Sequence, residues 1–319
     1  DPIKVAEGRY LSDELTLHYG LVPRTNRGIF AINELPDLSE RIQVGLLNIL
    51  EERDVQVRGY KIRLPIDVLL VASANPEDYT NRGRIITPLK DRFGSQIRTH
   101  YPLEASTEVQ IIRQEARPPS VGDVKVTVPA YMEHVVANFS QLARSSSQVN
   151  QRSGVSVRLS VSNYEVMAAN ALRRGLRLGE TNVVPRVCDL DAFAASTGGK
   201  IEIEALEEGR EGQVLRDLIK ASVLTVYRQV VQPELTGAVL TAFEEGVVVH
   251  TGEDVPSEEQ AMLIGNIPAL RPIVDSLIDG DDSAASVAAA VEFILEGMHL
   301  SKRLNKDTSG LGGGTYRAR

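Results

Sequence analysis

Three polar side chains in the first hundred residues are of the types that phosphoryl transfer uses. Glu34 could act as a general base towards a water that attacks a phosphoryl group, and Asn75 could orient that water. Arg92 could neutralise the negative charge that develops on the phosphate. Two of them also have an ordinary structural interpretation, in which Glu34 caps a strand and faces solvent and Arg92 forms an ion pair on a helix surface.

Two short apolar runs are expected to position these side chains. Residues 29–32 are all apolar, are too few for a lone helix, and predict a strand buried on both faces that ends at Asn33 and Glu34. Residues 68–72 predict a second buried strand, followed by the polar end at residues 73–75. In open α/β sheets, ligand and catalytic groups gather at the carboxyl ends of the strands. Two such strands, each ending in polar residues, therefore make a stronger case for a site than either alone.

The remaining elements follow from periodicity and turn signals. Apolar residues at helical spacing between positions 42 and 50 predict a helix, and alternation on both sides of a Gly-containing turn predicts a β-hairpin over residues 54–64. A short helix is expected over residues 89–93 and a third strand over residues 97–101. Beyond Pro102 the pattern is helical, with helices expected at residues 106–116, 128–145, 159–178, 185–196, 206–231, 255–278 and 283–304. Asp282 and Ser283 supply the N-cap signal of the last helix, and the Gly-rich tail from Thr308 is expected to be disordered.

Composition limits the classes of function. The 319 residues are 42% hydrophobic and 24% charged, as in an ordinary globular chain of about two domains. The net charge of −8 disfavours nonspecific nucleic-acid binding, although it leaves room for a local basic loop. The absence of Trp and the small number of Tyr and Phe argue against stacking platforms for single strands. No apolar run reaches the length of a bilayer span, and the lone Cys188 excludes a disulfide framework, so a reducing cytoplasm is the expected compartment.

The order and spacing of several motifs resemble the second half of an AAA+ ATPase core, in the clade that contains magnesium chelatase subunit I and the MoxR proteins. Residues 30–34 (Phe-Ala-Ile-Asn-Glu) are similar to a Walker B motif, and residues 71–76 (Val-Ala-Ser-Ala-Asn-Pro) are similar to sensor 1. Residues 88–94 (Pro-Leu-Lys-Asp-Arg-Phe-Gly) resemble the family segment whose Arg is a finger offered to the neighbouring subunit. The resemblance extends to about residue 200; the residues beyond it match chelatase-like C-terminal extensions more loosely.

Further positions follow from this resemblance. Residues 1–22 look like the helix-2 insertion of the clade, the hairpin over 54–64 looks like its pre-sensor-1 insertion, and Arg158 falls where the sensor-2 Arg of the lid is expected. The implied fold is α/β, the second half of a P-loop NTPase core with a parallel sheet flanked by helices, followed by a helical lid and a mostly helical extension. The implied parts are a half-core over 1–103, a lid over 104–200, an extension over 201–307 and a disordered tail over 308–319.

Two departures from the family pattern bear on activity. Asn33 stands where Walker B motifs usually carry Asp, and a neutral Asn should hold a Mg²⁺-bound water less firmly. The chain also has no Gly-x-x-x-x-Gly-Lys-Ser/Thr sequence; Gly198, Gly199 and Lys200 come nearest and predict only a helix-ending turn. The phosphate-binding loop is therefore expected upstream of Asp1, in a longer protein of which this chain is a fragment.

The resemblance implies a motor that couples ATP hydrolysis to remodelling of a partner protein, with ATP and Mg²⁺ as cofactors. It implies catalytic roles for Glu34, Asn75 and Arg92. It further implies Mg²⁺ contacts from Asn33 and Glu34 and a nucleotide contact from Arg158. The expected assembly is a homo-oligomeric ring, taken as a hexamer, and a von Willebrand A-type subunit with a metal-ion-dependent adhesion site is a candidate partner. The alternatives are a nucleotide-switched scaffold that hydrolyses poorly and, disfavoured by the acidic balance, a DNA translocase.

Overall fold

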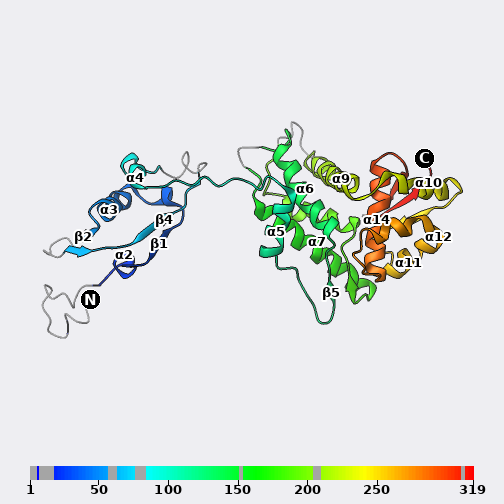
Figure 1. Cartoon of the computed structure of the whole chain (residues 1–319), viewed down its shortest axis with the longest axis horizontal. Coiled ribbons are helices and arrows are strands. Elements are labelled where there is room, and N and C mark those ends of the chain that lie inside the picture. Colours follow the sequence, from blue (N-terminus) through cyan, green and yellow to red (C-terminus); the bar gives the residue numbers. More distant parts are fainter. Residues whose placement is uncertain are drawn as a thin grey trace. The chain divides into compact units, whose positions relative to one another are not determined.

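The structure, a computed structural model, describes residues 6, 18–56, 63–75, 84–150, 154–203, 210–309 and 313–319. The chain divides into two compact units, Asp1–Thr99 and His100–Arg319. The first is a small α/β unit and the second is mostly helical (Figure 1). No described helix is both long enough and apolar enough to cross a bilayer.

The first unit contains a parallel pair of strands and an antiparallel hairpin. Its elements are α2 (Leu21–Arg24), β1 (Ile29–Ile32), η2 (Leu35–Asp37), α3 (Glu40–Glu51), β2 (Asp54–Gln56), β3 (Arg63–Pro65), β4 (Leu69–Ala72) and α4 (Thr87–Arg92). β1 runs parallel to β4, and β2 runs antiparallel to β3, as the sequence predicts. The turn of the hairpin and most of the predicted insertion over residues 1–22 lie outside the described residues.

One face of the β1–β4 sheet carries the core of the first unit. α3 and α4 bring Leu46 and Leu89 into a buried cluster with Leu35, against the inner residues of both strands. The other face is open, because Ile29 is 65% exposed and Leu69 is 61% exposed. The prediction that these strands are buried on both faces is therefore wrong for this chain. Runs of apolar residues are typical of strands that are packed on both faces, but the described residues of this chain pack against one face only.

Residues 97–101, predicted as a third strand, form no strand. Ile97 is 89% exposed, and the segment spans the division between the two units. A strand requires a neighbour with which its backbone can exchange hydrogen bonds. Alternating apolar residues do not supply that neighbour, and none of the described residues does so here.

The second unit packs helices around α14. Its elements are α5 (Ala105–Glu115), β5 (Lys125–Val126), α6 (Ala130–Ser145), α7 (Val157–Leu178), β6 (Asn182–Val183), η4 (Val187–Ala192), α8 (Phe193–Thr197), α9 (Glu211–Val230), η5 (Pro233–Leu235), α10 (Thr236–Glu244), β7 (Val249–Thr251), α11 (Ser257–Ala261), α12 (Leu263–Asn266), η6 (Pro268–Leu270), α13 (Arg271–Asp275), α14 (Ala284–Leu300), β8 (Asn305–Ser309) and β9 (Gly313–Arg317). α6 packs against α5, α7 and α9, while α14 packs against α9 and α11.

Most of the predicted helices of this unit are confirmed, and two are not. Residues 185–196, predicted as one helix, form the 3-10 helix η4 followed by the short α8. Ser283 caps α14 as expected, its Oγ accepting the Ser286 N–H at 3.3 Å. Residues 255–278, predicted as a single helix, form four short pieces instead. Pro268 and Pro272 lie within this stretch, and each lacks the N–H that a continuous helix needs.

A large buried core of the described residues runs through the second unit, across the boundary predicted at residue 200. The rings of Tyr131 on α6 and Phe293 on α14 lie 4.6 Å apart between centroids. Phe139 and Phe193 form a further edge-to-face pair at 5.2 Å. The segments predicted as lid and extension thus share one core, because periodicity identifies the apolar face of a helix but not the helix that will cover it.

The C-terminal tail, predicted to be disordered from Thr308, contains ordered strands. β9 pairs with both β7 and β8. Tyr316 on β9 is fully buried, and its hydroxyl donates to Glu296, which also pairs with Lys306 at 2.7 Å. Burial raises the pKa of Glu296, but the charge and hydrogen bond of Lys306 outweigh it and hold that pKa below its ordinary value. Gly314 permits this packing, because a Cβ there would lie 2.2 Å from the Lys306 side chain.

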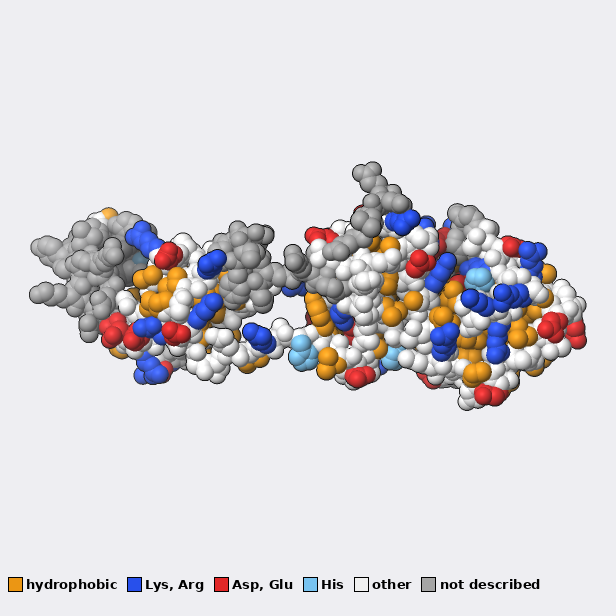
Figure 2. Space-filling model, turned by 90° about the horizontal axis from the view of Figure 1, so that it is seen from above, with side chains coloured by type: hydrophobic (Ala, Val, Ile, Leu, Met, Phe, Trp, Pro, Cys, Tyr) orange, Lys and Arg blue, Asp and Glu red, His pale blue; other side chains and the backbone are white. Residues whose placement is uncertain are grey.

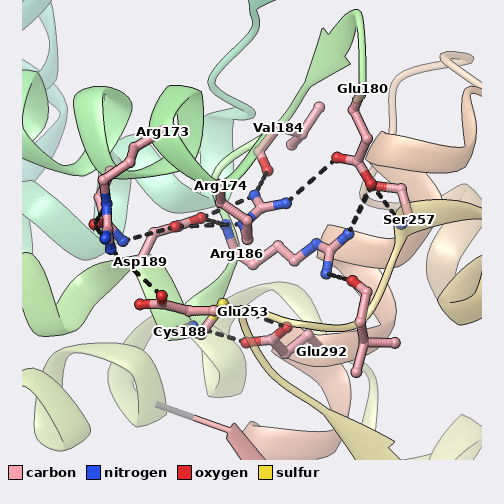
Figure 3. Close-up of polar contacts among 12 residues, drawn as sticks. Arg173, Arg174, Glu180, Val184, Arg186, Cys188, Asp189, Glu253, Ser257 and Glu292 are labelled. Carbon is pink, nitrogen blue, oxygen red and sulfur yellow. Dashed lines mark hydrogen bonds and ion pairs between the residues drawn. The ribbon is translucent and has the colours of Figure 1, made fainter. Parts of the chain in front are cut away.

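A cluster of buried charges joins α7 to the segments that follow it (Figure 3). The side chains of Arg174 and Arg186 have no exposed surface. Arg174 Nη2 lies 3.0 Å from Asp189 Oδ2 and donates to the carbonyl of Val184 at 2.8 Å. Arg186 Nη2 lies 3.7 Å from Glu180 Oε1. Burial, with the charge of Arg174 added, lowers the pKa of Arg186.

Cys188 lies within this cluster. Its backbone N–H donates to Glu292 Oε1 at 2.7 Å, and its Sγ lies 3.9 Å from Glu292 Oε2. Burial and the charge of Glu292 raise the pKa of the Cys188 thiol well above its ordinary value. Because the thiolate is the reactive form, this cysteine is suited to packing rather than to nucleophilic chemistry.

We expect Asp189→Asn to destabilise the second unit by about 3–5 kcal/mol, because it leaves the buried Arg174 guanidinium with only the more distant Glu180 carboxylate at 3.6 Å. Asp189 also accepts the Arg186 N–H at 2.8 Å and the Asn170 Nδ2 at 2.9 Å, so its loss weakens several contacts at once. Urea unfolding followed by far-ultraviolet circular dichroism measures the change.

Asp307→Asn is the matched control. Asp307 pairs with Arg317 at 3.0 Å, but both side chains are more than half exposed, and such pairs contribute at most about 1 kcal/mol. If the free energy of unfolding falls equally in the two variants, the buried cluster contributes no more to stability than an exposed pair does.

Candidate functional site

Asn33 and Glu34 lie directly beside the residues that follow β4. The parallel register sets the ends of β1 and β4 level with each other. The Ser73 N–H donates to the carbonyl of Ile32 at 2.9 Å, and the Leu35 N–H donates to the carbonyl of Ser73 at 2.9 Å. The structure therefore brings the two predicted polar strand ends to one edge of the sheet.

Ser73 links the two strand ends, and the sequence assigned it no chemical role. Its Oγ accepts the backbone N–H of Glu34 at 3.1 Å and lies 3.4 Å from Asn33 Oδ1. The only signal in the sequence was its place directly after an apolar run. Through these contacts, β4 positions the backbone and side chains that follow β1.

Glu34 combines a strained backbone with an exposed side chain. Its φ of 52° and ψ of 56° lie in the left-handed region, which costs a residue other than glycine about 1 kcal/mol. The Asp37 N–H donates to the Glu34 carbonyl at 2.9 Å, and Leu35, only 2% exposed, anchors the turn in the core. Within the described part of the chain the Glu34 carboxylate has no hydrogen-bond or ion-pair partner. A carboxylate held in this way is available to accept a proton from water.

The oxygen donors at this edge fit Mg²⁺ in their chemistry. Asn33 and Glu34 are both exposed and offer an amide oxygen and a carboxylate. Mg²⁺ commonly binds one or two protein oxygens and completes its shell with water and substrate phosphate. Asn75, also exposed, adds an amide three residues after β4. Among the described residues, no group of three or more His, Cys, Asp and Glu side chains could hold a metal ion.

Arg92 ends α4 and contacts α3. Its Nε donates to Glu51 Oε2 at 2.7 Å, and its Nη1 donates to the carbonyl of Pro88 at 2.9 Å. The Arg92 side chain is 32% exposed and that of Glu51 is 55% exposed, so solvent screens the pair. Within one chain, Arg92 thus makes the helix-surface ion pair of its structural interpretation, although with Glu51 rather than with a neighbour in sequence. Buried Leu89 fixes the helix that carries it.

Arg158 lies in the first turn of α7, in the second unit. Its N–H donates to Oγ of the N-cap residue Ser156 at 3.2 Å, and its side chain is exposed. Arg144 on α6 binds Glu108 on α5 through two hydrogen bonds, of 2.7 and 2.8 Å. Glu108 also accepts the hydroxyl of Ser160 on α7, so three helices hold the turn that carries Arg158.

Two other features do not contribute to the predicted site. A cavity of about 720 Å³ in the first unit is lined by α3 and β2, and none of the predicted site residues lines it. Gly198, Gly199 and Lys200 form the turn that ends α8, as predicted, with Gly199 at a φ of +77°. The Lys200 ammonium donates to the Ser162 hydroxyl at 2.6 Å.

The N-terminal region matches a known family. Residues 7–92 match the family described as the sigma-54 interaction domain. This match covers β1, β4 and α4, which carry Asn33, Glu34, Asn75 and Arg92.

Individual relatives cover the same region. The chain is 36% identical over 95 residues to the magnesium-chelatase 38 kDa subunit of Cereibacter sphaeroides, covering 29% of this chain and 27% of that protein. It is 33% identical over 99 residues to the magnesium-chelatase subunit ChlI of Anabaena variabilis, covering 30% and 28%. It is 26% identical over 208 residues to the hydrogenase transcriptional regulatory protein HoxA of Cupriavidus necator, covering 60% and 40%. The chain thus spans about a quarter of the length of the chelatase relatives that it matches.

Proposed function

We propose that this chain, whose N-terminal region belongs to the AAA+ ATPases in the clade of the magnesium-chelatase subunits, carries the water-activating half of an ATP-hydrolysing site. We further propose that hydrolysis is coupled to remodelling of a partner protein. The observation that carries the proposal is the meeting of Asn33 and Glu34 with the residues after β4 at one edge of a parallel sheet. That edge is where α/β sheets bind ligands.

The proposed roles follow from the chemistry of the side chains. Glu34 accepts a proton from the attacking water, and Asn75 holds that water by its amide. Asn33 and Glu34 supply oxygen contacts towards Mg²⁺, which when bound neutralises phosphate charge. Ser73 acts as a positioning residue, because it holds the Glu34 N–H and contacts Asn33 Oδ1.

The open face of the sheet supports the idea that another segment completes the site. Ile29, Leu69 and Val71 are 65%, 61% and 49% exposed on a strand pair whose other face is packed. Burial of such side chains is worth about 1.5–3 kcal/mol each, so a covering segment would bind there favourably. The printed sequence has no Gly-x-x-x-x-Gly-Lys-Ser/Thr loop, and we propose that the covering segment supplies it.

Assembly and lid contacts belong to the same proposal. Arg92 acts on the site of a neighbouring subunit in a homo-oligomeric ring, proposed as a hexamer, and Arg158 contacts nucleotide from the second unit. A von Willebrand A-type subunit is the proposed protein partner, and the cytoplasm is the proposed compartment. The Arg92–Glu51 pair is exposed enough to exchange for a contact with phosphate, because solvent already weakens it.

A second candidate function is a nucleotide-switched scaffold that hydrolyses slowly. The observation that favours it is Asn33, which brings no charge where the family usually has Asp. ATP turnover by the intact protein separates the two candidates. Sustained turnover supports the motor, whereas binding without turnover supports the switch.

We expect residues 1–319 alone to bind ATP weakly or not at all. In P-loop proteins the backbone N–H groups and the Lys of the loop hold the phosphates, and this chain has no such loop. Isothermal calorimetry of ATP binding to residues 1–319 measures the affinity. Tight ATP binding by residues 1–319 alone would contradict the proposed division of the site.

A further inference from the structure

A group of basic side chains lies where α14 ends and the C-terminal sheet begins. Residues 301–319 contain five basic residues and one acidic residue, in a chain of net charge −8. Four of these are exposed, and one of the four, Arg317, pairs with Asp307. We call the other three, Lys302, Arg303 and Arg319, the C-terminal basic cluster. Figure 2 shows Lys and Arg side chains gathered on one face of the second unit.

Contacts hold the three members of the cluster together. Arg319 Nη1 donates to the carbonyl of Lys302 at 2.8 Å. Arg303 follows Lys302 in the chain, and its Nη1 donates to the hydroxyl of Thr236 at the start of α10. The backbone at Lys302 therefore brings the three residues together, and their printed contacts are to neutral groups.

In the described part of the chain the cluster lacks carboxylate partners, unlike the neighbouring cations Lys306 and Arg317. Among the described residues, no Asp or Glu pairs with Lys302, Arg303 or Arg319. The adjacent Lys306 pairs with Glu296 at 2.7 Å, and Arg317 pairs with Asp307 at 3.0 Å. Elsewhere in the unit Arg173, Arg177 and Arg271 all contact carboxylates. Like charges on neighbouring residues repel one another, so an anion that contacts them would be bound favourably.

The backbone at Lys302 forms the turn that ends α14. Its φ of 62° is left-handed, and it occupies the position after the end of α14 where glycine is usual. The Lys302 N–H donates to His299 at 2.8 Å, and the Arg303 N–H donates to Met298 at 2.9 Å. The helix dipole favours a cation at this end of α14. Solvent and salt screen this interaction at the surface, so it does not explain three cations or a strained residue. This turn places Lys302 and Arg303 together where α14 ends.

We infer that the C-terminal basic cluster is a docking surface for an acidic segment of a partner protein. A carboxylate can pair with the Lys ammonium and with either Arg guanidinium group. The guanidinium groups can bind it through two parallel hydrogen bonds. A nucleic acid fits less well, because three cations neutralise few phosphates and Tyr316, the nearby aromatic residue, is fully buried. The net negative charge of the chain also disfavours binding of a long polyanion. This inference does not depend on ATP hydrolysis.

The test measures binding of a fluorescent glutamate-rich peptide to the full chain by anisotropy, without nucleotide. The triple variant Lys302→Gln, Arg303→Gln, Arg319→Gln should weaken binding at least tenfold, and added salt should weaken binding to the wild-type chain. The control variant Arg173→Gln, Arg177→Gln, Arg271→Gln removes the same charge from the same unit and should change affinity by less than about twofold. Circular dichroism establishes that both variants are folded.

Lys302→Gly separates charge from structure. Glycine relieves the left-handed backbone, so the melting temperature should rise or stay unchanged while peptide affinity falls. Equal affinities of the two triple variants would overturn the inference. So would tighter binding of a DNA duplex of the same charge than of the peptide, because the surface would then select phosphate rather than carboxylate.

Discussion

Glu34→Gln should abolish ATP turnover in the intact protein while leaving nucleotide binding and assembly unchanged. The amide keeps the shape of the side chain but cannot accept the proton of the attacking water, and loss of a general base lowers the rate by about 10²–10⁴-fold. Because the Glu34 carboxylate has no partner among the described residues, its replacement breaks no internal ion pair. Phosphate release measures turnover, and a fluorescent ATP analogue measures binding.

Asp37→Asn is the matched control for this prediction. Asp37 is exposed, ends η2 and lies three residues from Glu34, so the variant removes the same charge from the same turn. It should retain most of the turnover. If Glu34→Gln retains as much activity as Asp37→Asn, then Glu34 is a structural strand-end residue and not the base.

Arg92→Ala should bind ATP and hydrolyse it about 10³-fold more slowly, if the arginine completes the site of a neighbouring subunit. A Glu34→Gln subunit has an inactive site of its own but still carries Arg92. Mixing the two inactive variants should therefore restore part of the activity, because some intact Glu34 sites gain an intact Arg92 neighbour. Turnover is measured across mixing ratios, with ring formation followed by size-exclusion chromatography.

Glu51→Gln distinguishes this role from the local ion pair. Arg92 Nη2 lies 2.5 Å from Glu51 Oε2, so this variant breaks the pair while keeping the arginine. If ATP turnover depends on the Arg92–Glu51 pair itself, Glu51→Gln should be as inactive as Arg92→Ala, and mixing the two inactive variants should restore no activity. Activity in Glu51→Gln together with rescue in mixed rings supports action on the neighbouring subunit.

Local sequence determined the individual elements well. The apolar runs predicted β1 and β4, alternation predicted the hairpin of β2 and β3, and helical spacing predicted α3, α6, α7 and α14. Ser283 was identified as the cap of α14 from its residue type and position. These features depend on interactions within a few residues, such as backbone dihedral preference, capping and the period of apolar side chains.

Features that depend on distant partners were missed or mistaken. The order of the C-terminal tail depends on Tyr316 reaching Glu296 on another element, and a Gly-rich composition gives no sign of it. The segment over 97–101 has the pattern of a strand but no strand beside it. The open face of β1 and β4 likewise depends on what covers the sheet, which the pattern of the strands cannot specify.

At the candidate site, residue types and order alone identified Asn33, Glu34, Asn75 and Arg92. Only the tertiary structure decided how the strand-end residues are held: Ser73 reaches across from β4, and the buried turn after β1 keeps Glu34 in a left-handed conformation. The tertiary structure also decided that Arg92 pairs with Glu51, 41 residues away in the chain. The physical reason is that a side chain's chemistry is intrinsic to its type, whereas its orientation, strain and partners depend on which distant segments the fold brings within hydrogen-bonding distance.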